Sequence, residues 1–296
     1  MREVLTGLVI KVRRRQYWVV SGDLRDGEKI NCRIKGRAMI PVCGDEVDVM
    51  REGDEGIISL IHPRRNLFYR SDAMKQKLIA ANVTQIIGMT APDVALDEML
   101  LNRWIVAAEA TGCRFILIAN KSDLPGFEEL RRRLAFYQTK LGITTIASCA
   151  ARDASSLLPY LADQRSVLVG QSGMGKSTLI NALIPVAQAE TGEISASLGG
   201  GRHTTTATTL YPLPIPHNGW IIDIPGIRVF GLAHFSISEL TRAFVDIAPF
   251  AVQCQFRNCR HRQEPGCMVQ AATRDGQIHP KRLQLFHVLA NSEIGR

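Results

Sequence analysis

Residues near the middle of the chain carry the pattern of a phosphate-binding loop. Residues 170–177 read GQSGMGKS, which fits GxxxxGK[ST], and they lie between an apolar run at 166–169 and a helical run. In this motif backbone N–H groups surround the phosphates, the lysine reaches the β- and γ-phosphates, and the serine hydroxyl binds magnesium. The alternative is a glycine-rich turn between a strand and a helix. We predict a nucleotide site whose phosphate-binding residues are Gly170, Gln171, Ser172, Gly173, Met174, Gly175, Lys176, Ser177 and Thr178.

A second polar stretch has the chemistry of a guanine reader. The apolar run at 114–119 ends in Asn120, Lys121, Ser122 and Asp123. A carboxylate such as Asp123 can accept hydrogen bonds from both N1–H and the exocyclic amine of guanine, whereas adenine offers no such pair of donors. Asn120 can bond the purine edge and hold its loop, and the Lys121 stem can lie over the ring. The alternative is an ordinary polar turn.

Three further segments complete a GTPase set. Ser148, Cys149 and Ala150 follow the run at 143–147 and stand where GTPases support the guanine carbonyl with a backbone N–H. Residues 223–226 read DIPG, in which Asp223 would hold magnesium through water and Gly226 would sense the γ-phosphate. Residues 197–206, SLGGGRHTTT, should supply a switch threonine for magnesium from Thr204, Thr205 or Thr206, and the sequence does not distinguish among these three.

These segments occur in an unusual order along the chain. The guanine reader comes first, followed by the support loop, the phosphate loop, the threonines and DxxG. Circular permutation produces this order without losing contacts if the original termini lay close together. We therefore predict a circularly permuted P-loop domain.

The residue after DxxG bears on hydrolysis. Ras-like enzymes place a water-orienting glutamine there, but this chain has Ile227, which cannot polarise water. His203 is our candidate for positioning water or acting as a weak base, alongside Lys176 as the second catalytic residue. Alternatively, His203 only packs or contacts RNA, and Arg202 or Arg228 stabilises transition-state charge. We expect slow turnover alone and faster turnover on a partner that orders the switch.

A cysteine cluster near the C-terminus indicates metal binding. Cys254, Cys259, His261 and Cys267 supply three thiolates and one imidazole, which can close a tetrahedral structural zinc site. The alternatives are clustered thiols without metal, or a ligand set that includes His279 or His287. Basic residues around the cluster would give a surface for RNA phosphates: Arg257, Arg260, Arg262, Lys281 and Arg282.

The elements that must position these residues form three regions. Five short strand-like runs within residues 1–66 predict a small barrel of the OB or SH3-like kind, followed by a basic linker at 61–72. Strands then alternate with helical runs at 98–112, 127–142 and 176–184, which predicts a mostly parallel α/β sheet. After residue 235 the pattern is helical. In the barrel, the basic run at 13–15 beside Tyr17 and Trp18 either binds nucleic acid or is a basic turn with core aromatics.

The composition excludes some protein classes. With 46% hydrophobic and 22% charged residues the chain reads as globular, and no apolar run is long enough for a membrane helix. The N-terminal residues lack the features of a signal peptide, so we expect a cytoplasmic protein. The net charge of +8 favours a polyanionic partner or serves solubility.

Taken together, these motifs resemble the ribosome-small-subunit-dependent GTPase A family, from GDEV at 44–47 and PRRN at 63–66 to the cysteine cluster. The resemblance implies a multidomain α/β protein with an OB-fold over 1–66, a circularly permuted GTPase domain over 70–235 and a helical zinc-binding domain over 236–296. It implies GTP and GDP with magnesium, one structural zinc, and the small ribosomal subunit with its rRNA during late maturation. We expect a monomer whose hydrolysis the ribosome stimulates. The competing hypotheses are a nucleotide-gated RNA-binding scaffold without useful hydrolysis and an ATP-dependent enzyme such as a nucleotide kinase, which NKSD argues against.

Overall fold

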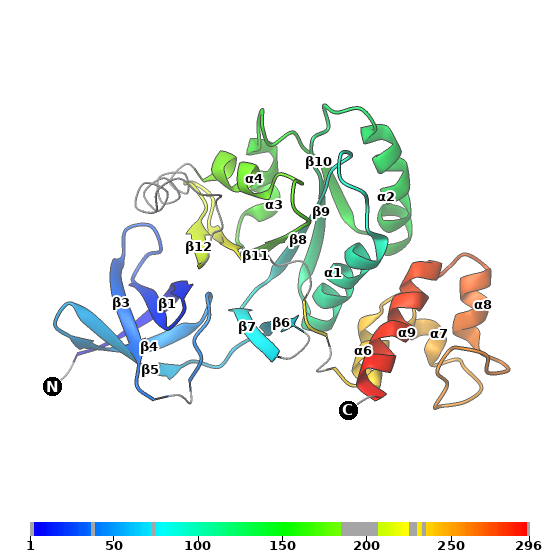
Figure 1. Cartoon of the computed structure of the whole chain (residues 1–296), viewed down its shortest axis with the longest axis horizontal. Coiled ribbons are helices and arrows are strands. Elements are labelled where there is room, and N and C mark those ends of the chain that lie inside the picture. Colours follow the sequence, from blue (N-terminus) through cyan, green and yellow to red (C-terminus); the bar gives the residue numbers. More distant parts are fainter. Residues whose placement is uncertain are drawn as a thin grey trace.

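Three neighbouring parts make up the computed structural model, which describes residues 3–36, 39–72, 75–184, 207–224, 230–232 and 235–294. A barrel, an α/β layer and a helical part follow one another along the chain (Figure 1). No helix in the described ranges is both long and apolar enough to cross a bilayer.

The N-terminal part is a five-stranded barrel. Its strands are β1 (Val4–Arg13), β2 (Gln16–Ser21), β3 (Glu28–Ile34), β4 (Glu46–Glu52) and β5 (Glu55–Ile61). Strand β1 pairs antiparallel with both β2 and β4, and β3 pairs parallel with β5, which closes the ring. Alternate side chains such as Val9, Val19 and Ile58 fill its core, as the period of a strand requires. The predicted barrel is confirmed, with the five-stranded closure of an OB-fold.

The aromatic residues beside the basic run at 13–15 have different environments. Tyr17 lies in the barrel core and is 4% exposed, so it cannot stack on a base. Trp18 is partly exposed, and the Lys11 ammonium lies 5.7 Å from the centroid of its ring. For Tyr17, the alternative of a core aromatic beside a basic turn is the correct one.

The α/β layer is built on a mostly parallel sheet. Its strands are β8 (Gln85–Thr90), β9 (Arg114–Ala119), β10 (Thr144–Ala147), β11 (Gln164–Val169), β12 (Thr208–Pro212) and β13 (Gly219–Asp223). They lie in the order β10-β9-β8-β11-β13-β12, and only β12 is antiparallel to its neighbour in this series. The loops that follow β9, β10, β11 and β13 therefore leave from one edge of the sheet.

Helices cover both faces of this sheet. Helices α1 (Glu98–Thr111) and α2 (Phe127–Leu141) lie on one face, while the short η1 (Ser155–Leu157) and α3 (Leu158–Leu161) lie with α4 (Lys176–Leu183) on the other (Figure 1). Apolar residues of β9 alternate between the two cores, with Leu117 in one and Ile116 in the other. The Asp97 side chain accepts a hydrogen bond from the Leu100 N–H and thereby caps α1.

A hairpin replaces much of the expected linker at 61–72. Strands β6 (Leu67–Asp72) and β7 (Lys75–Ala81) pair antiparallel. Phe68 is buried, and its ring lies 5.0 Å from that of Phe230, centroid to centroid. The linker prediction was wrong over these residues because an apolar anchor outweighs the basic character of the stretch.

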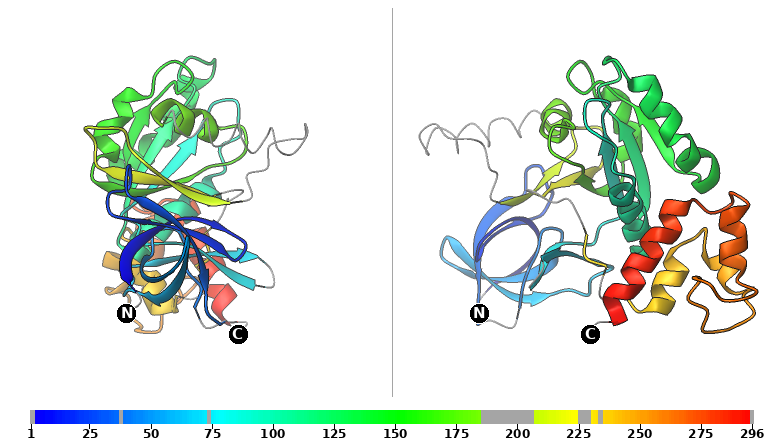
Figure 2. Two further views of the ribbon diagram at one scale, coloured as in Figure 1. Left: turned by 90° about the vertical axis from the view of Figure 1, so that its left-hand side faces the viewer. Right: turned by 45° about the vertical axis from the view of Figure 1, so that its right-hand side comes forward.

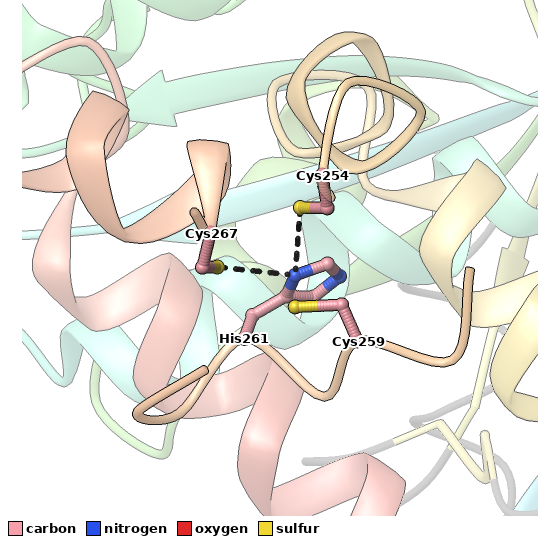
Figure 3. A group of neighbouring side chains, drawn as sticks. All are labelled: Cys254, Cys259, His261 and Cys267. Atoms are coloured by element: carbon pink, nitrogen blue, oxygen red, sulfur yellow. Dashed lines mark hydrogen bonds between the residues drawn. The ribbon is translucent and has the colours of Figure 1, made fainter. Parts of the chain in front are cut away.

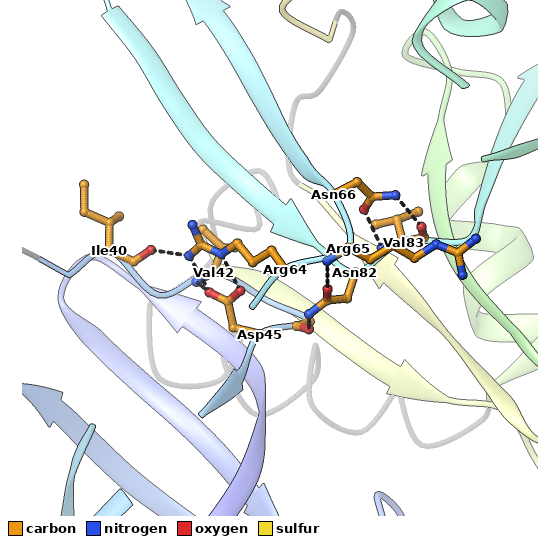
Figure 4. A network of polar contacts seen from close by, with 9 residues as sticks. Ile40, Val42, Asp45, Arg64, Arg65, Asn66, Asn82 and Val83 are labelled. Carbon is orange, nitrogen blue, oxygen red and sulfur yellow. Dashed lines mark hydrogen bonds and ion pairs between the residues drawn. The ribbon is translucent and has the colours of Figure 1, made fainter. Parts of the chain in front are cut away.

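Buried polar contacts join the barrel to the α/β layer (Figure 4). Asp45 is fully buried and receives two hydrogen bonds from the Arg64 guanidinium, each 2.7 Å long. Asn82 donates to the Gly44 carbonyl and accepts from the Arg65 N–H. Strand β1 also pairs with β12 at Lys11 and Val12, so one sheet runs from the barrel into the α/β layer.

The C-terminal part is helical and packs against α1. Its helices are α6 (Ile237–Ala243), α7 (Ala248–Ala251), α8 (Met268–Arg274) and α9 (Pro280–Ile294). Ser236 and Glu239 form a capping box at the start of α6. One apolar core contains Trp104 of α1 together with Leu240 and Phe286, which places α9 beside α1 (Figure 2).

Candidate functional site

The edge of the sheet brings together the loops that the sequence singles out. The NKSD loop follows β9, the SCA loop follows β10, the phosphate loop follows β11, and Asp223 ends β13. Asn120 and Met174 are 54 positions apart in the sequence, yet a hydrogen bond joins them and brings the base and phosphate loops into direct contact.

Asn120 is the residue that joins three loops. Its side-chain Nδ2 donates to the Met174 carbonyl of the phosphate loop at 2.9 Å, and its Oδ1 accepts from the Ala150 N–H at 3.1 Å. Asn120 itself is 2% exposed. A Cβ atom at position 175 would lie 2.5 Å from the Asn120 Nδ2, so only glycine permits this approach. Both ends of the amide therefore hold the protein together, in addition to any bond with a purine.

Lys121 has a partner outside the motif. Its backbone has φ of 57°, in the left-handed region, and its ammonium lies 2.5 Å from a carboxylate oxygen of Asp93 in the loop between β8 and α1. Val94 of the same loop faces Gly173 of the phosphate loop. This ion pair fixes the direction of the Lys121 stem, which is the part that would cover a purine ring.

The Asp123 carboxylate meets two side chains of the neighbouring loop. The Cys149 thiol donates to Oδ1 at 3.1 Å, and an Arg152 nitrogen lies 3.6 Å from Oδ2. The hydrogen bond from Cys149, followed by a backbone N–H and the charge of Arg152, lowers the pKa of Asp123. The carboxylate is therefore ionised at neutral pH and can accept hydrogen bonds from a base with two donors.

The phosphate loop adopts its turn through two glycines with positive φ. Gly173 has φ of 85° and Gly175 has φ of 94°, while Met174 between them is buried. The Lys176 ammonium donates to the carbonyls of Gly170 and Gln171, at 2.6 and 2.8 Å. Ser177 and Thr178 are exposed in the first turn of α4, where backbone N–H groups and a hydroxyl can meet phosphate and magnesium.

Asp223 lies within the electrostatic reach of the phosphate-loop lysine. Burial raises the pKa of Asp223, and the positive charge of Lys176 opposes that shift. A carboxylate oxygen at this strand end is the kind of ligand that magnesium prefers.

Several predicted residues lie outside the described ranges. They are Arg202, His203, Thr204, Thr205, Thr206, Gly226, Ile227 and Arg228. The assignments to the switch threonines, to His203 and to the γ-phosphate sensor therefore stay predictions.

The four metal-ligand candidates converge (Figure 3). The ligand atoms of Cys254, Cys259, His261 and Cys267 all lie within 4.8 Å of one another. The His261 Nδ1 is 3.6 Å from the sulfurs of both Cys254 and Cys267. Tetrahedral zinc with ordinary bond lengths separates sulfur from nitrogen by about 3.6 Å. The cluster can thus hold one zinc ion.

Residues around the cluster orient His261, which has φ of 59°. Its carbonyl accepts from the Gln270 side chain at 2.7 Å and lies 3.0 Å from the His287 Nε2. His287 therefore contacts the backbone of a candidate ligand and is not itself one of the four side chains that converge. His279 packs on Phe136 and Tyr137 instead, so neither alternative histidine replaces a ligand.

One member of the expected basic surface is buried. Arg282 is 0% exposed, and it donates to Asp246 at 2.9 Å and to Glu109 at 3.0 Å. Its assignment to an RNA-binding surface was wrong because two carboxylates from distant segments enclose it. Arg257, Arg260, Arg262 and Lys281 are exposed.

Sequence reasoning missed three side chains that shape these sites. Asp93 and Arg152 contact the NKSD loop, and Glu109 pairs with Arg282 across 173 positions. The only signal for Arg152 is its place just after the SCA loop. Asp93 and Glu109 belong to a loop and a helix with no motif of their own.

The mostly parallel sheet follows a five-stranded barrel, and its base loop precedes its phosphate loop along the chain, which reverses the usual order of these loops. This arrangement defines a circularly permuted P-loop GTPase. Residues 61–233 match the RsgA GTPase family model. The chain belongs to the RsgA GTPase family, and it is a GTP hydrolase.

Relatives carry the family's name, and solved structures share the fold. A Nitrosospira multiformis protein named small ribosomal subunit biogenesis GTPase RsgA is 42% identical, over 97% of this chain and 91% of its own. A Bordetella pertussis protein of the same name is 43% identical, over 95% and 93%. The crystal structure of YjeQ from Thermotoga maritima superimposes with a TM-score of 0.73 at 24% identity, covering 99% of this chain and all of the other. That of YloQ, described as a circularly permuted GTPase, gives 0.70 at 25% identity, covering 99% and 96%.

Proposed function

We propose that this chain binds the small ribosomal subunit and its rRNA and hydrolyses GTP to GDP during late maturation of that subunit, stimulated by the ribosome. The names of the relatives support the assignment to small-subunit biogenesis. The single observation that carries the nucleotide site is Asn120, which holds the base reader, the support loop and the phosphate loop together.

The proposed division of roles follows from the loops. Asp123 accepts from the guanine N1–H and amine, the Lys121 stem covers the ring, and the Ala150 segment lies beside the base carbonyl. Lys176 leaves its loop carbonyls for the β- and γ-phosphates. Magnesium, held by Ser177 and through water by Asp223, would neutralise the developing phosphate charge.

Basic side chains support an RNA partner. Arg257, Arg260 and Lys281 are exposed around the cysteine cluster, and the whole chain carries a charge of +8. Such side chains gain affinity for RNA by displacing counterions from phosphates. A structural zinc at Cys254, Cys259, His261 and Cys267 would hold their loop in shape. We propose that the protein acts as a cytoplasmic monomer.

The direct test is GTP hydrolysis measured with and without purified small subunits. We expect slow turnover alone and at least about tenfold faster turnover with subunits. Lys176→Ala should abolish both, and Arg131→Ala should change neither, because Arg131 lies exposed on α2 and pairs only with Glu128 in the described contacts. Turnover that subunits fail to raise would favour the nucleotide-gated scaffold instead.

The base assignment has its own test. Asp123→Asn should weaken GDP binding and favour xanthosine diphosphate, because an amide can donate to the xanthine 2-oxygen. Unchanged preference for GDP in this variant would overturn the role of Asp123.

A further inference from the structure

The carboxylate that would read guanine is held by a thiol from another loop. Cys149 donates to Asp123 Oδ1 at 3.1 Å. The torsion of an aspartate carboxylate is broad and roughly two-fold, so a carboxylate on a surface loop turns easily unless something holds it. The Asp123 side chain is 30% exposed, so its polar contacts contribute to its orientation.

The backbone beneath this thiol is closely fixed. The Ser148 N–H donates to the Ala119 carbonyl, and the Ser148 carbonyl accepts from the Ser122 N–H at 3.0 Å, so the two loops are joined by main-chain bonds. The Cys149 carbonyl accepts from the N–H groups of both Arg152 and Asp153.

A side-chain turn then fixes the end of the loop. Asp153 accepts from the backbone N–H and the hydroxyl of Ser155, each at 2.8 Å. The Cβ of Cys149 therefore starts from a defined position, and its sulfur can act as a positional anchor.

The sulfur keeps its proton under ordinary conditions. The hydrogen bond to Asp123, followed by burial and the nearby negative charge, raises the pKa of the Cys149 thiol. A protonated thiol is a donor, although a weak one. Arg152 provides charge at 3.6 Å but is 74% exposed, so its contribution to the geometry is smaller.

We propose that Cys149 is a positioning residue for base selection: its thiol holds the plane of the Asp123 carboxylate so that both oxygens meet the N1–H and 2-amino donors of guanine. This inference rests on the proposed nucleotide site. It predicts that the thiol contributes to discrimination against hypoxanthine nucleotides, which keep N1–H but lack the 2-amino group. Each carboxylate oxygen has two lone pairs, so Oδ1 can accept from both the thiol and the base.

The experiment measures the affinities of GDP and inosine diphosphate for the full chain by calorimetry. Cys149→Ala should lower the GDP affinity about three- to tenfold, as expected for losing one weak hydrogen bond to a charged group, and change the inosine diphosphate affinity by less than about twofold. Cys149→Ser, which keeps a donor, should restore the GDP preference.

Cys113→Ala is the matched control. It removes a thiol from the residue just before β9, at the other end of that strand from the NKSD loop, where the thiol donates to the Val83 carbonyl. It should leave the ratio of the two affinities unchanged. Thermal melts of each variant show whether folding is affected, and the ratio remains informative for any variant that folds.

The outcomes separate the inference from the proposed function. If Cys149→Ala lowers both affinities equally or neither, the positioning role is wrong, even though the wild type prefers GDP. If the wild type itself does not prefer GDP over inosine diphosphate, the assignment of Asp123 as base reader fails as well. The inference is supported if Cys149→Ala prefers GDP over inosine diphosphate less strongly than the wild type does, while Cys149→Ser keeps the preference of the wild type.

Discussion

At the scale of single residues, buried polar side chains decide how the parts of this molecule are held. Both ends of the Asn120 amide form hydrogen bonds with backbone groups of two other loops. Both carboxylate oxygens of Asp45 accept hydrogen bonds, from the Arg64 guanidinium and from the Val42 N–H. In each case removal of one side chain leaves buried partners without hydrogen bonds, which costs more than the bond itself contributes.

The Asp45–Arg64 pair gives a stability prediction. Asp45→Asn should destabilise the protein by about 2–4 kcal/mol, because the Arg64 guanidinium loses a fully buried carboxylate. Chemical denaturation monitored by tryptophan fluorescence measures the change. Arg33→Ala breaks the exposed pair with Glu52 and should cost less than about 1 kcal/mol. If the two substitutions lowered the free energy of unfolding equally, burial would not be the reason that the Asp45–Arg64 pair matters for stability.

At the scale of elements, strands with strong apolar patterns could be predicted from the sequence. The five barrel strands are confirmed, as are the apolar runs at 114–119, 143–147 and 166–169, which form β9, β10 and β11, because burial of their side chains requires apolar runs. Strand β12, TTLYP, and the β6–β7 hairpin were missed. Each is held by a distant segment, β12 through its pairing with β1 and the hairpin through the packing of Phe68 on Phe230, so tertiary context decides their structure.

The candidate site likewise has a part that could be predicted from the sequence and a part that could not. Motif spacing identified the loops, since phosphate and guanine chemistry demand particular residue types. The partners of those residues could not be predicted: Cys149 was singled out for its backbone, and its side-chain bond to Asp123 depends on how two loops meet. Likewise, nothing in the sequence around Arg282 distinguishes a buried arginine from an exposed one.

The contact between helices α1 and α9 should make stability depend on pH. Burial raises the pKa of Glu109 to about 7, against the opposing charge of Arg282. The folded state therefore holds this proton more tightly than the unfolded state, whose carboxyl has a pKa near 4.5. The stabilisation that comes from the Glu109 proton is complete below about pH 4.5 and is lost as pH rises through about 7. The free energy of unfolding falls over this range by at most about 3 kcal/mol.

Glu109→Gln is the variant that checks this dependence. The amide does not titrate, so the slope of unfolding free energy against pH between about 4.5 and 7 should be flatter than in the wild type. Urea denaturation across this range measures both slopes. Groups remote from Glu109 titrate equally in the two proteins, so parallel slopes would show that Glu109 does not titrate as inferred.

At the scale of the whole molecule, the cysteine cluster and α1 share one apolar core. We expect one zinc ion per chain by elemental analysis, and its removal by a chelator should loosen the C-terminal helices because metal binding supplies folding free energy. Hydrogen exchange should rise over residues 254–287, while the affinity for GDP changes by less than about twofold. Unaltered exchange after proven loss of zinc would contradict a structural role.

The pairing of β1 with β12 restricts how the chain can be divided. The barrel and the α/β layer share a ladder at Lys11, Val12, Thr208 and Thr209, although a cut at residues 62–66 would look harmless along the sequence. Either fragment would carry a bare strand edge able to pair with other chains. Isolated halves of this protein should consequently be prone to self-association.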